Sequence, residues 1–185
     1  MSTRLSEKVH ALLIEEGLNP DPMPETTIHT PNDNEPNGVH SEENVTMLKL
    51  PVQGKQGEWV CIVRVFEQTE RLLVYSLLPR DVPKSEREKI ALMLTQINYG
   101  LVLGNFEMDL GDGEVRYKTS MDVEGIEPSR LMLRNLLFGN FFSMDLYFKA
   151  LMNALDSDRD VSSLVYEAEH PDSIGHFDLV DDVVH

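Results

Sequence analysis

Residues 58–67 are predicted to form a β-strand that is apolar on both of its faces. The side chains of one face are Trp59, Cys61, Val63 and Val65. Those of the other face are Val60, Ile62, Arg64 and Phe66, of which only the arginine is charged. An apolar strand face is stable only when it is covered. The chain must therefore cover a sheet on both sides, either with its own helices or with a partner.

Two further apolar runs flank this strand, at residues 45–50 and 72–78. They are separated from it by a glycine-bounded segment, Gly54–Gly57, and by a polar turn at residues 67–70. Short runs rich in Val, Ile, Leu and Tyr between such turns are typical of strands in a meander. The sequence therefore predicts three consecutive antiparallel strands.

The N-terminal part predicts a helix and then a segment without regular structure. Leu5, Val9, Leu12 and Leu13 share one face of a helix over residues 3–17, which Gly17 ends. Residues 18–44 contain five prolines among Asp, Asn, Glu, Thr and Gly. Proline removes backbone donors, and few apolar groups are present to offset the entropy of ordering. We expect a linker or a long loop here.

A second helix is predicted after residues 79–83. Its start carries a capping-box pattern, with Ser85 followed three residues later by Glu88. Its buried stripe is predicted to consist of Ile90, Leu94, Ile97 and Leu101. Either Gly100 or Gly104 would end it.

Two short runs around Gly111-Asp112-Gly113 predict a β-hairpin. A two-residue turn at Asp112-Gly113 would place Asp109 opposite Arg116 and Glu107 opposite Lys118. A shift of one residue would set charges against apolar groups, so the side chains select the register. The ladder of opposite charges explains the two carboxylates without acid–base chemistry.

The last helix is predicted to run from Glu127 to Leu155, with Pro128 at its first position. Leucines mark one side of it and charged residues the other. Phe138, Phe141 and Phe142 fall on the charged side, which is unusual for a solvated face. These three residues either form a partner-binding surface or turn into the core through a break at Gly139-Asn140.

Charge divides the chain. Of the formal net charge of −16, most lies in residues 16–44 and 156–185, and the middle is nearly neutral. The expected organisation is an N-terminal helix (1–17), a proline-rich acidic linker (18–44), an α+β domain (45–155) and an acidic flexible tail (156–185). Such a chain offers no basic stripe for phosphates, so we expect no nucleic-acid partner. No apolar run is long enough to span a membrane.

Few residues of the sequence suggest catalysis or the binding of a metal or phosphate. The lone cysteine, Cys61, lies mid-strand among apolar neighbours, which is typical of a core residue in a reducing compartment. The group Asp172, His176 and Asp178 could bind a metal only weakly, and we expect no metal site there. The sequence shows no phosphate loop and no nucleophile elbow. We expect a cytoplasmic protein without catalytic residues or cofactor.

Residues 45–155 resemble the YbjN family of bacterial and plastid proteins, which are labelled sensory-transduction regulators. The resemblance rests on three stretches, Tyr75–Pro79, Asn98–Glu107 and Asp112–Lys118. These stretches resemble the variant that is typical of cyanobacterial members of the family. It implies a fold like that of type III secretion chaperones, in the order α-β-β-β-α-β-β-α. Those chaperones are often dimers that hold extended segments of client proteins. The resemblance implies no catalytic residues.

The leading hypothesis is a protein-binding module that is chaperone-like or regulatory. Its interface would bind either a partner or client protein or a second copy of the chain in a homodimer. A sensor of a small molecule or metal, with a pocket between sheet and helices, is the competing hypothesis. A structural subunit of a larger assembly is the third. A closed cavity with converging polar groups would favour the sensor, and a broad exposed apolar surface would favour the binding module.

Overall fold

The computed structural model describes residues 4–24, 26–31 and 40–170. The helices are α1 (Leu5–Glu15), α2 (Arg87–Gly100), α3 (Arg130–Asp156) and α4 (Val161–Glu169). The strands are β1 (Asp21–Pro22), β2 (Thr26–Pro31), β3 (His40–Gln53), β4 (Glu58–Phe66), β5 (Arg71–Leu77), β6 (Asn105–Met108) and β7 (Val115–Asp122).

The strands form one antiparallel sheet in the order β1-β3-β4-β5-β7-β6, and β2 also pairs with β3. The prediction of an α+β fold with an antiparallel sheet and surrounding helices is confirmed. The predicted order of elements is also found, since α1 is followed by β3, β4, β5, α2, β6, β7 and α3. Three further elements, β1, β2 and α4, lie in segments that the sequence did not predict to be regular.

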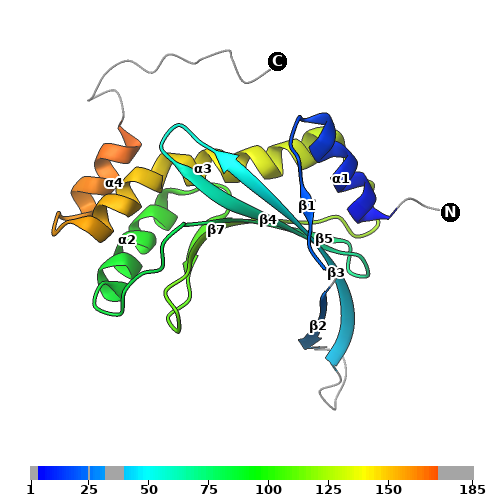
Figure 1. The fold of residues 1–185 in the computed structure, drawn as a ribbon, viewed down its shortest axis with the longest axis horizontal. Helices are drawn as coiled ribbons and strands as arrows, with labels where there is room; N and C mark the ends of the chain where they lie inside the picture. Colours follow the sequence, from blue (N-terminus) through cyan, green and yellow to red (C-terminus); the bar gives the residue numbers. More distant parts are fainter. Residues whose placement is uncertain (1–3, 25, 32–39, 171–185) are drawn as a thin grey trace.

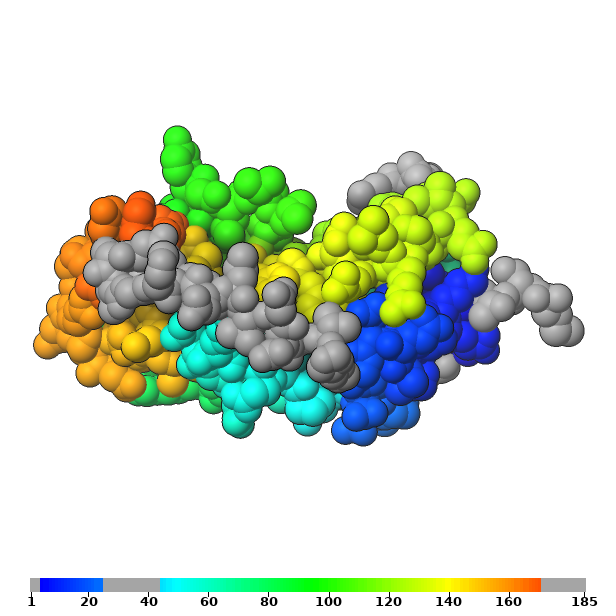
Figure 2. All heavy atoms as spheres, turned by 90° about the horizontal axis from the view of Figure 1, so that it is seen from above, coloured from blue at the N-terminus to red at the C-terminus, as the bar shows by residue number. Residues whose placement is uncertain are grey.

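The helices pack against one face of the sheet (Figure 1). Trp59, Cys61, Val63 and Val65 of β4 point to this face and are buried in a core that all four helices share. Figure 2 shows the helix side, where α3 (yellow) runs between α1 (blue) at one end and α4 (orange) at the other. The β3–β4 hairpin reaches α3 from the side, because Asp145 accepts hydrogen bonds from the amides of Lys55 and Gln56.

Strands β1 and β2 lie inside residues 18–44, where a linker or loop was predicted. Both pair with β3, Asp21 opposite Lys49 and Thr26 opposite Val45. Proline is tolerated in strands at the edge of a sheet, because one of its sides needs no donor. The prediction from composition is wrong for these residues. It rested on the number of prolines, whereas the strands that contain them lie at the edge of the sheet, where proline is tolerated. Residues 32–39 lie outside the described part of the chain.

Helix α4 lies inside residues 156–185, where a flexible tail was predicted. Asp160 caps it by accepting a hydrogen bond from the Ser163 amide at 2.9 Å. Leu164 and Val165 are buried in the core. The prediction is therefore wrong for residues 161–169, where acidic residues flank the helix rather than prevent it. Residues 171–185 are outside the described range, and the division of the chain into four parts stays a prediction.

The predicted starts of α2 and α3 are shifted. Helix α2 begins after Glu86 without a side-chain cap, so the predicted capping box of Ser85 and Glu88 does not form. Helix α3 begins after Ser129, whose side chain accepts a hydrogen bond from the Met132 amide at 3.2 Å. Pro128 therefore precedes the cap rather than opening the helix. A serine side chain can accept this bond, and serine is among the preferred residues for the cap.

The β6–β7 hairpin exists, but its predicted register is wrong by two residues. Glu107 lies opposite Arg116 instead of Lys118, and Asp109 lies opposite Glu114. The turn is longer than two residues because two aspartates close it from within. Asp109 accepts a hydrogen bond from the Gly111 amide at 2.6 Å, and Asp112 accepts one from Glu114 at 2.9 Å. A shift of two keeps every side chain on its predicted face, so polarity alone could not exclude it.

Helix α3 is continuous through Gly139-Asn140, and Asn140 fastens it to the sheet. Its side chain is 0 % exposed and accepts a hydrogen bond from the Ser76 hydroxyl at 2.6 Å. It donates to the Val74 and Tyr117 carbonyls at 3.0 and 3.2 Å, and to the Thr119 hydroxyl at 3.3 Å. One amide thus joins α3 to both β5 and β7. The predicted break at this position does not occur.

The outer edge of β6 is occupied by a side chain. Asn98 of α2 accepts a hydrogen bond from the Phe106 amide at 2.8 Å and donates to the Phe106 carbonyl at 3.0 Å. Its amide group thus takes the place of a neighbouring strand. Gly104 lets the chain enter β6 close to β7, because its φ of +71° favours glycine and an added Cβ would meet the Lys118 carbonyl.

Candidate protein-binding surface

The second face of the sheet has no helix over it within the described ranges (Figure 1). We call it the open face. Its apolar side chains are Met47, Val60, Ile62, Phe66, Leu73, Tyr75 and Leu77, contributed by β3, β4 and β5. All of them except Tyr75 are half-buried. The sequence predicted that this side of β4 needs a cover, and the described residues leave it uncovered.

Tyr75 lies at the centre of the open face between two arginines. The Arg64 guanidinium is 5.2 Å from the centroid of the Tyr75 ring, and the Arg116 guanidinium is 4.4 Å from it. The ring attracts both cations through its negative face. Only 7 % of Tyr75 is exposed, because the two arginine side chains and its neighbours cover it. The result is an apolar surface with a cationic centre.

The two arginines differ in their partners. Arg116 forms ion pairs with Glu107 and Glu114 at 3.1 and 3.5 Å. Arg64 has no carboxylate partner among the described residues, and its buried Nε has no hydrogen-bond acceptor. Leaving a buried charged donor without an acceptor costs about 1–3 kcal/mol. Arg64 is therefore poised to bind an anionic group. In the sequence it stood out only as the single charge in a two-sided apolar strand.

Glu107 organises the cations beside Tyr75. It accepts hydrogen bonds from Arg116 Nε at 3.1 Å and from the Lys118 ammonium. Partial burial raises the pKa of Glu107, but hydrogen bonds from Lys118, Arg116 and Asn105 outweigh it, so that the pKa is lower than usual. The carboxylate thus stays charged and neutralises its neighbours on β7. Among the described residues, no carboxylate neutralises Arg64 on β4 in this way.

We expect the Glu107→Gln variant to be less stable than the wild type by about 0.5–1 kcal/mol at pH 7. A lowered pKa in the folded state stabilises the protein above the pKa of the unfolded chain, near 4.5, and this contribution is lost as the pH falls through the folded value. The difference between variant and wild type should therefore shrink at pH 3. Urea unfolding at both pH values measures it, with Glu58→Gln, an exposed carboxylate of the same face, as control. An equal difference at both pH values would contradict the linkage.

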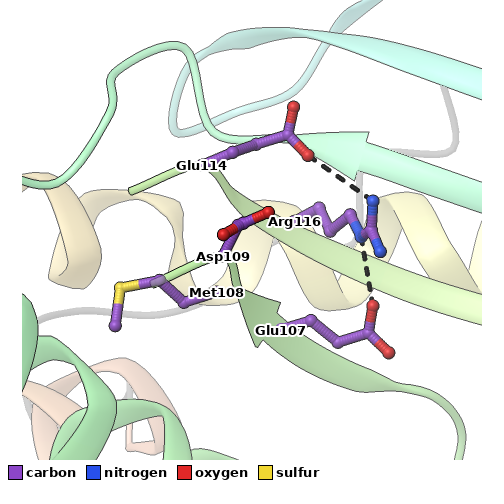
Figure 3. A pocket seen from close by; sticks show the side chains of 5 residues that line it. All are labelled: Glu107, Met108, Asp109, Glu114 and Arg116. Carbon is purple, nitrogen blue, oxygen red and sulfur yellow. Dashed lines mark hydrogen bonds and ion pairs between the residues drawn. The ribbon is translucent and has the colours of Figure 1, made fainter. Parts of the chain in front are cut away.

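A shallow pocket of about 320 Å³ lies at the turn end of the β6–β7 hairpin (Figure 3). Its lining consists of Glu107, Met108, Asp109, Glu114 and Arg116. Figure 3 shows Arg116 held between Glu107 and Glu114. Arg116 is therefore already paired, and the Asp109 carboxylate accepts a hydrogen bond from the Gly111 amide. The pocket also lies at the end of the hairpin rather than between sheet and helices, where the sensor hypothesis expected a pocket.

The three phenylalanines of α3 are placed differently from one another. Phe141 is buried in the core at 8 % exposure, and Phe138 is half-buried against it. Phe142 is 71 % exposed. The rings still form a cluster, since Phe138 lies 5.8 Å from Phe141 and 6.4 Å from Phe142 between centroids. The outer side of α3 thus presents Phe142 and part of Phe138, and their role in partner binding stays a prediction.

The connection between α2 and β6 exposes three apolar residues. Tyr99 is 96 % exposed, Val102 94 % and Leu103 64 %. The Tyr117 hydroxyl donates to the Leu103 carbonyl, so the backbone is held while the side chains point to solvent. Apolar residues held in this way are typical of contact surfaces.

Other candidate chemistry is limited. Cys61 is fully buried, and burial raises the pKa of its thiol. Within the described ranges, no three His, Cys, Asp or Glu side chains are grouped so that they could hold a metal ion. The predicted weak group of Asp172, His176 and Asp178 lies outside those ranges. None of the helices described here has the length and apolar character needed to cross a membrane.

Comparison with known proteins relates part of the chain to a protein family. Residues 45–134 match the model of the YbjN family, which is described as "Putative bacterial sensory transduction regulator". The match begins in β3 and ends in the first turn of α3, so it includes every strand of the open face. No curated protein matches the chain.

Proposed function

We propose that the protein is a non-catalytic regulatory module that binds another protein through the open face, and the match of residues 45–134 to the YbjN family model supports a regulatory or binding role. The observation that carries the proposal is an apolar sheet face without a helix over it, on which Arg64 lies beside Tyr75 with its buried Nε unpaired. We place this activity in the cytoplasm, since a lone buried cysteine fits a reducing compartment.

The composition of the open face supports a protein partner. Interfaces are enriched in aromatic residues, Met and Arg, and those residues form most energetic hot spots. Here Tyr75, Phe66, Met47 and Arg64 lie together on one face of the sheet. In the chaperone-like form of the proposal, this face binds an extended segment or a helix of a client. The outer side of α3 around Phe142 offers a second contact, for a client or a second copy.

The alternative of a small-molecule sensor receives less support. The side chains of β4, β5 and α3 fill the layer between sheet and helices with one continuous core. In the pocket at the hairpin, Arg116 is already paired with Glu107 and Glu114. A binding role therefore fits the open face better than an internal ligand site.

Photo-crosslinking tests the proposal. A photoreactive phenylalanine analogue at Leu73, on the open face, is expected to capture a partner protein in the cell that makes this chain. The same analogue at Leu92, which is 59 % exposed on α2, is the matched control. Combining the Leu73 probe with Arg64→Glu should reduce the crosslinked product at least about tenfold, because a mispaired interface charge costs several kcal/mol. Equal capture at Leu73 and Leu92, or no effect of Arg64→Glu, would contradict the assignment of the face.

A further inference from the structure

Any occupant of the open face must supply apolar side chains and a carboxylate for Arg64. The chain contains such a segment. Residues 171–185 carry four aspartates and no lysine or arginine, together with Ile174, Phe177, Leu179, Val180, Val183 and Val184. We propose that this segment binds the open face of its own molecule, with an aspartate carboxylate on Arg64. The inference rests on the proposed function, since it assigns a regulation to the same surface.

Arg64 is the arginine whose binding partner is missing. Every other arginine among the described residues binds a carboxylate or a backbone carbonyl, as Arg71 binds Asp122 and Arg87 binds the Leu110 carbonyl. The guanidinium of Arg64 lies over the Tyr75 ring, and its buried Nε lacks an acceptor among the described residues. A carboxylate that approached Nε and one terminal nitrogen would satisfy both in the paired geometry that arginine favours.

The segment starts on the helix face of the sheet, at its β6 end, and must pass the β6 edge to reach the open face. Tyr147 donates to Glu169 at the end of α4 at 2.9 Å, and Tyr147 also packs against Phe106 of β6 with 5.8 Å between ring centroids. Helix α4 therefore ends close to the β6 edge. Glu169 also approaches Gly100, where the connection from α2 to β6 begins.

The register places Arg64 within reach of that point. Arg64 pairs with Leu73, and Leu73 pairs with Ser120, two residues beyond the partner of Asn105 at the start of β6. Arg64 is thus level with the α2–β6 connection, three strand spacings or about 14 Å from the edge strand. The segment must also cross from the helix face of the sheet to the open face, and crossing this layer adds about 10 Å to its path. Nine extended residues, from Glu169 to Asp178, span about 30 Å, so Asp178, Asp181 and Asp182 all reach Arg64.

The route between these points is lined by exposed apolar side chains. Tyr99, Val102 and Leu103 occupy the α2–β6 connection, which the segment must pass, and all three are largely exposed. Ile174 is five residues beyond Glu169, about 17 Å along an extended chain, so it reaches this connection. The proposal therefore accounts for the exposed connection and for the unpaired Arg64 with one occupant. A partner protein would have to displace the segment.

Paramagnetic relaxation enhancement on the full chain tests the proposal. Cys61 is fully buried, so a spin label attaches selectively to a cysteine introduced as Val183→Cys. We expect loss of the amide signals of Ile62, Arg64 and Leu73. Arg64→Gln should restore these signals, and Lys84→Gln, at an exposed cation of the β5–α2 connection, should not. Replacing Asp178, Asp181 and Asp182 with asparagine should restore them as well, and this change leaves the described fold untouched.

Three results would overturn the proposal. The first is full signal intensity on the open face in the labelled wild type. The second is signal loss that persists after both Arg64→Gln and the aspartate replacements. The third is signal loss only between molecules, seen when unlabelled ¹⁵N chain is mixed with spin-labelled ¹⁴N chain, which would assign the segment to a second copy. If the signals stay intact while the Leu73 probe still captures a partner, the segment proposal fails alone. If the signals are lost in the wild type and the Leu73 probe captures nothing even after the three aspartate replacements release the segment, the proposed function fails and the segment proposal stands.

Discussion

Replacing Asn140 with alanine is expected to lower the free energy of unfolding by about 3–5 kcal/mol. The change leaves the Ser76 hydroxyl and the Val74 and Tyr117 carbonyls without their partner inside the core. Each buried polar group that loses its partner costs about 1–3 kcal/mol. The loss is a large part of the roughly 5–15 kcal/mol that stabilises a typical domain. Thermal unfolding should show a midpoint at least about 10 °C lower.

The matched control is Asn135→Ala on the same helix. Asn135 is exposed, so its replacement should change the stability by no more than about 0.5 kcal/mol. Trp59 reports on the same network, because its indole donates to the Ser76 hydroxyl at 2.8 Å. Its fluorescence should therefore change in the folded Asn140 variant. A midpoint equal to that of Asn135→Ala would show that Asn140 does not fasten α3 to the sheet.

Phe141 and Phe142 are neighbours on α3, but we expect their replacement by alanine to lower the stability by very different amounts. Phe141→Ala removes a side chain that is buried in the core and should cost about 3–5 kcal/mol of stability. Phe142→Ala removes a side chain that is 71 % exposed and should change the stability by less than about 0.5 kcal/mol. Chemical denaturation of both variants measures the difference. If the outer side of α3 binds a partner, Phe142→Ala should weaken that binding while the fold stays intact.

A destabilisation by Phe142→Ala as large as that by Phe141→Ala would contradict the placement of the two rings. Phe138→Ala provides an intermediate case, because this ring is half-buried and contacts both of the others. The stability of this variant should lie between those of Phe141→Ala and Phe142→Ala. A graded series would show that the three aromatic residues, which share a charged helix side in the sequence, divide between core and surface.

The hairpin shows what alternating polarity can and cannot predict. The alternation predicted the face of the side chains in the paired residues 105–108 and 115–118, and the structure agrees with it there. Leu110, which the pattern placed on the apolar face, lies in the turn and is 68 % exposed. The alternation did not fix the register, because a shift by two residues keeps each charge and each apolar group on its own face. The register was decided by Asp109 and Asp112, whose side chains close a longer turn. Such local hydrogen bonds leave little trace in a periodic pattern.

The flanking segments show a different limit. Proline and acidic residues favoured a loop at residues 18–44 and a flexible tail after residue 156, yet β1, β2 and α4 form there. Each of these elements depends on a distant partner. Strands β1 and β2 depend on the edge of β3, and α4 depends on contacts with α2 and α3. Composition describes a segment in isolation, and so it could not report a partner elsewhere in the chain.

The candidate surface was predictable in part. The two apolar faces of β4 indicated that one side of the sheet needs a cover. The importance of Arg64 was not predictable, because its unpaired state depends on where every carboxylate of the fold lies.

The Asn98 clamp on Phe106 bears on how this protein avoids aggregation. An exposed edge strand offers unpaired amides and carbonyls that recruit strands from other chains, which is the first step toward fibrils. At β6 the amide and carbonyl of Phe106 are already bound, so this peptide cannot serve as a template for an incoming strand. A protein that keeps one face of its sheet apolar would be at particular risk if that edge were also open. Blocking the edge with one side chain leaves the face available for association while preventing the sheet from growing.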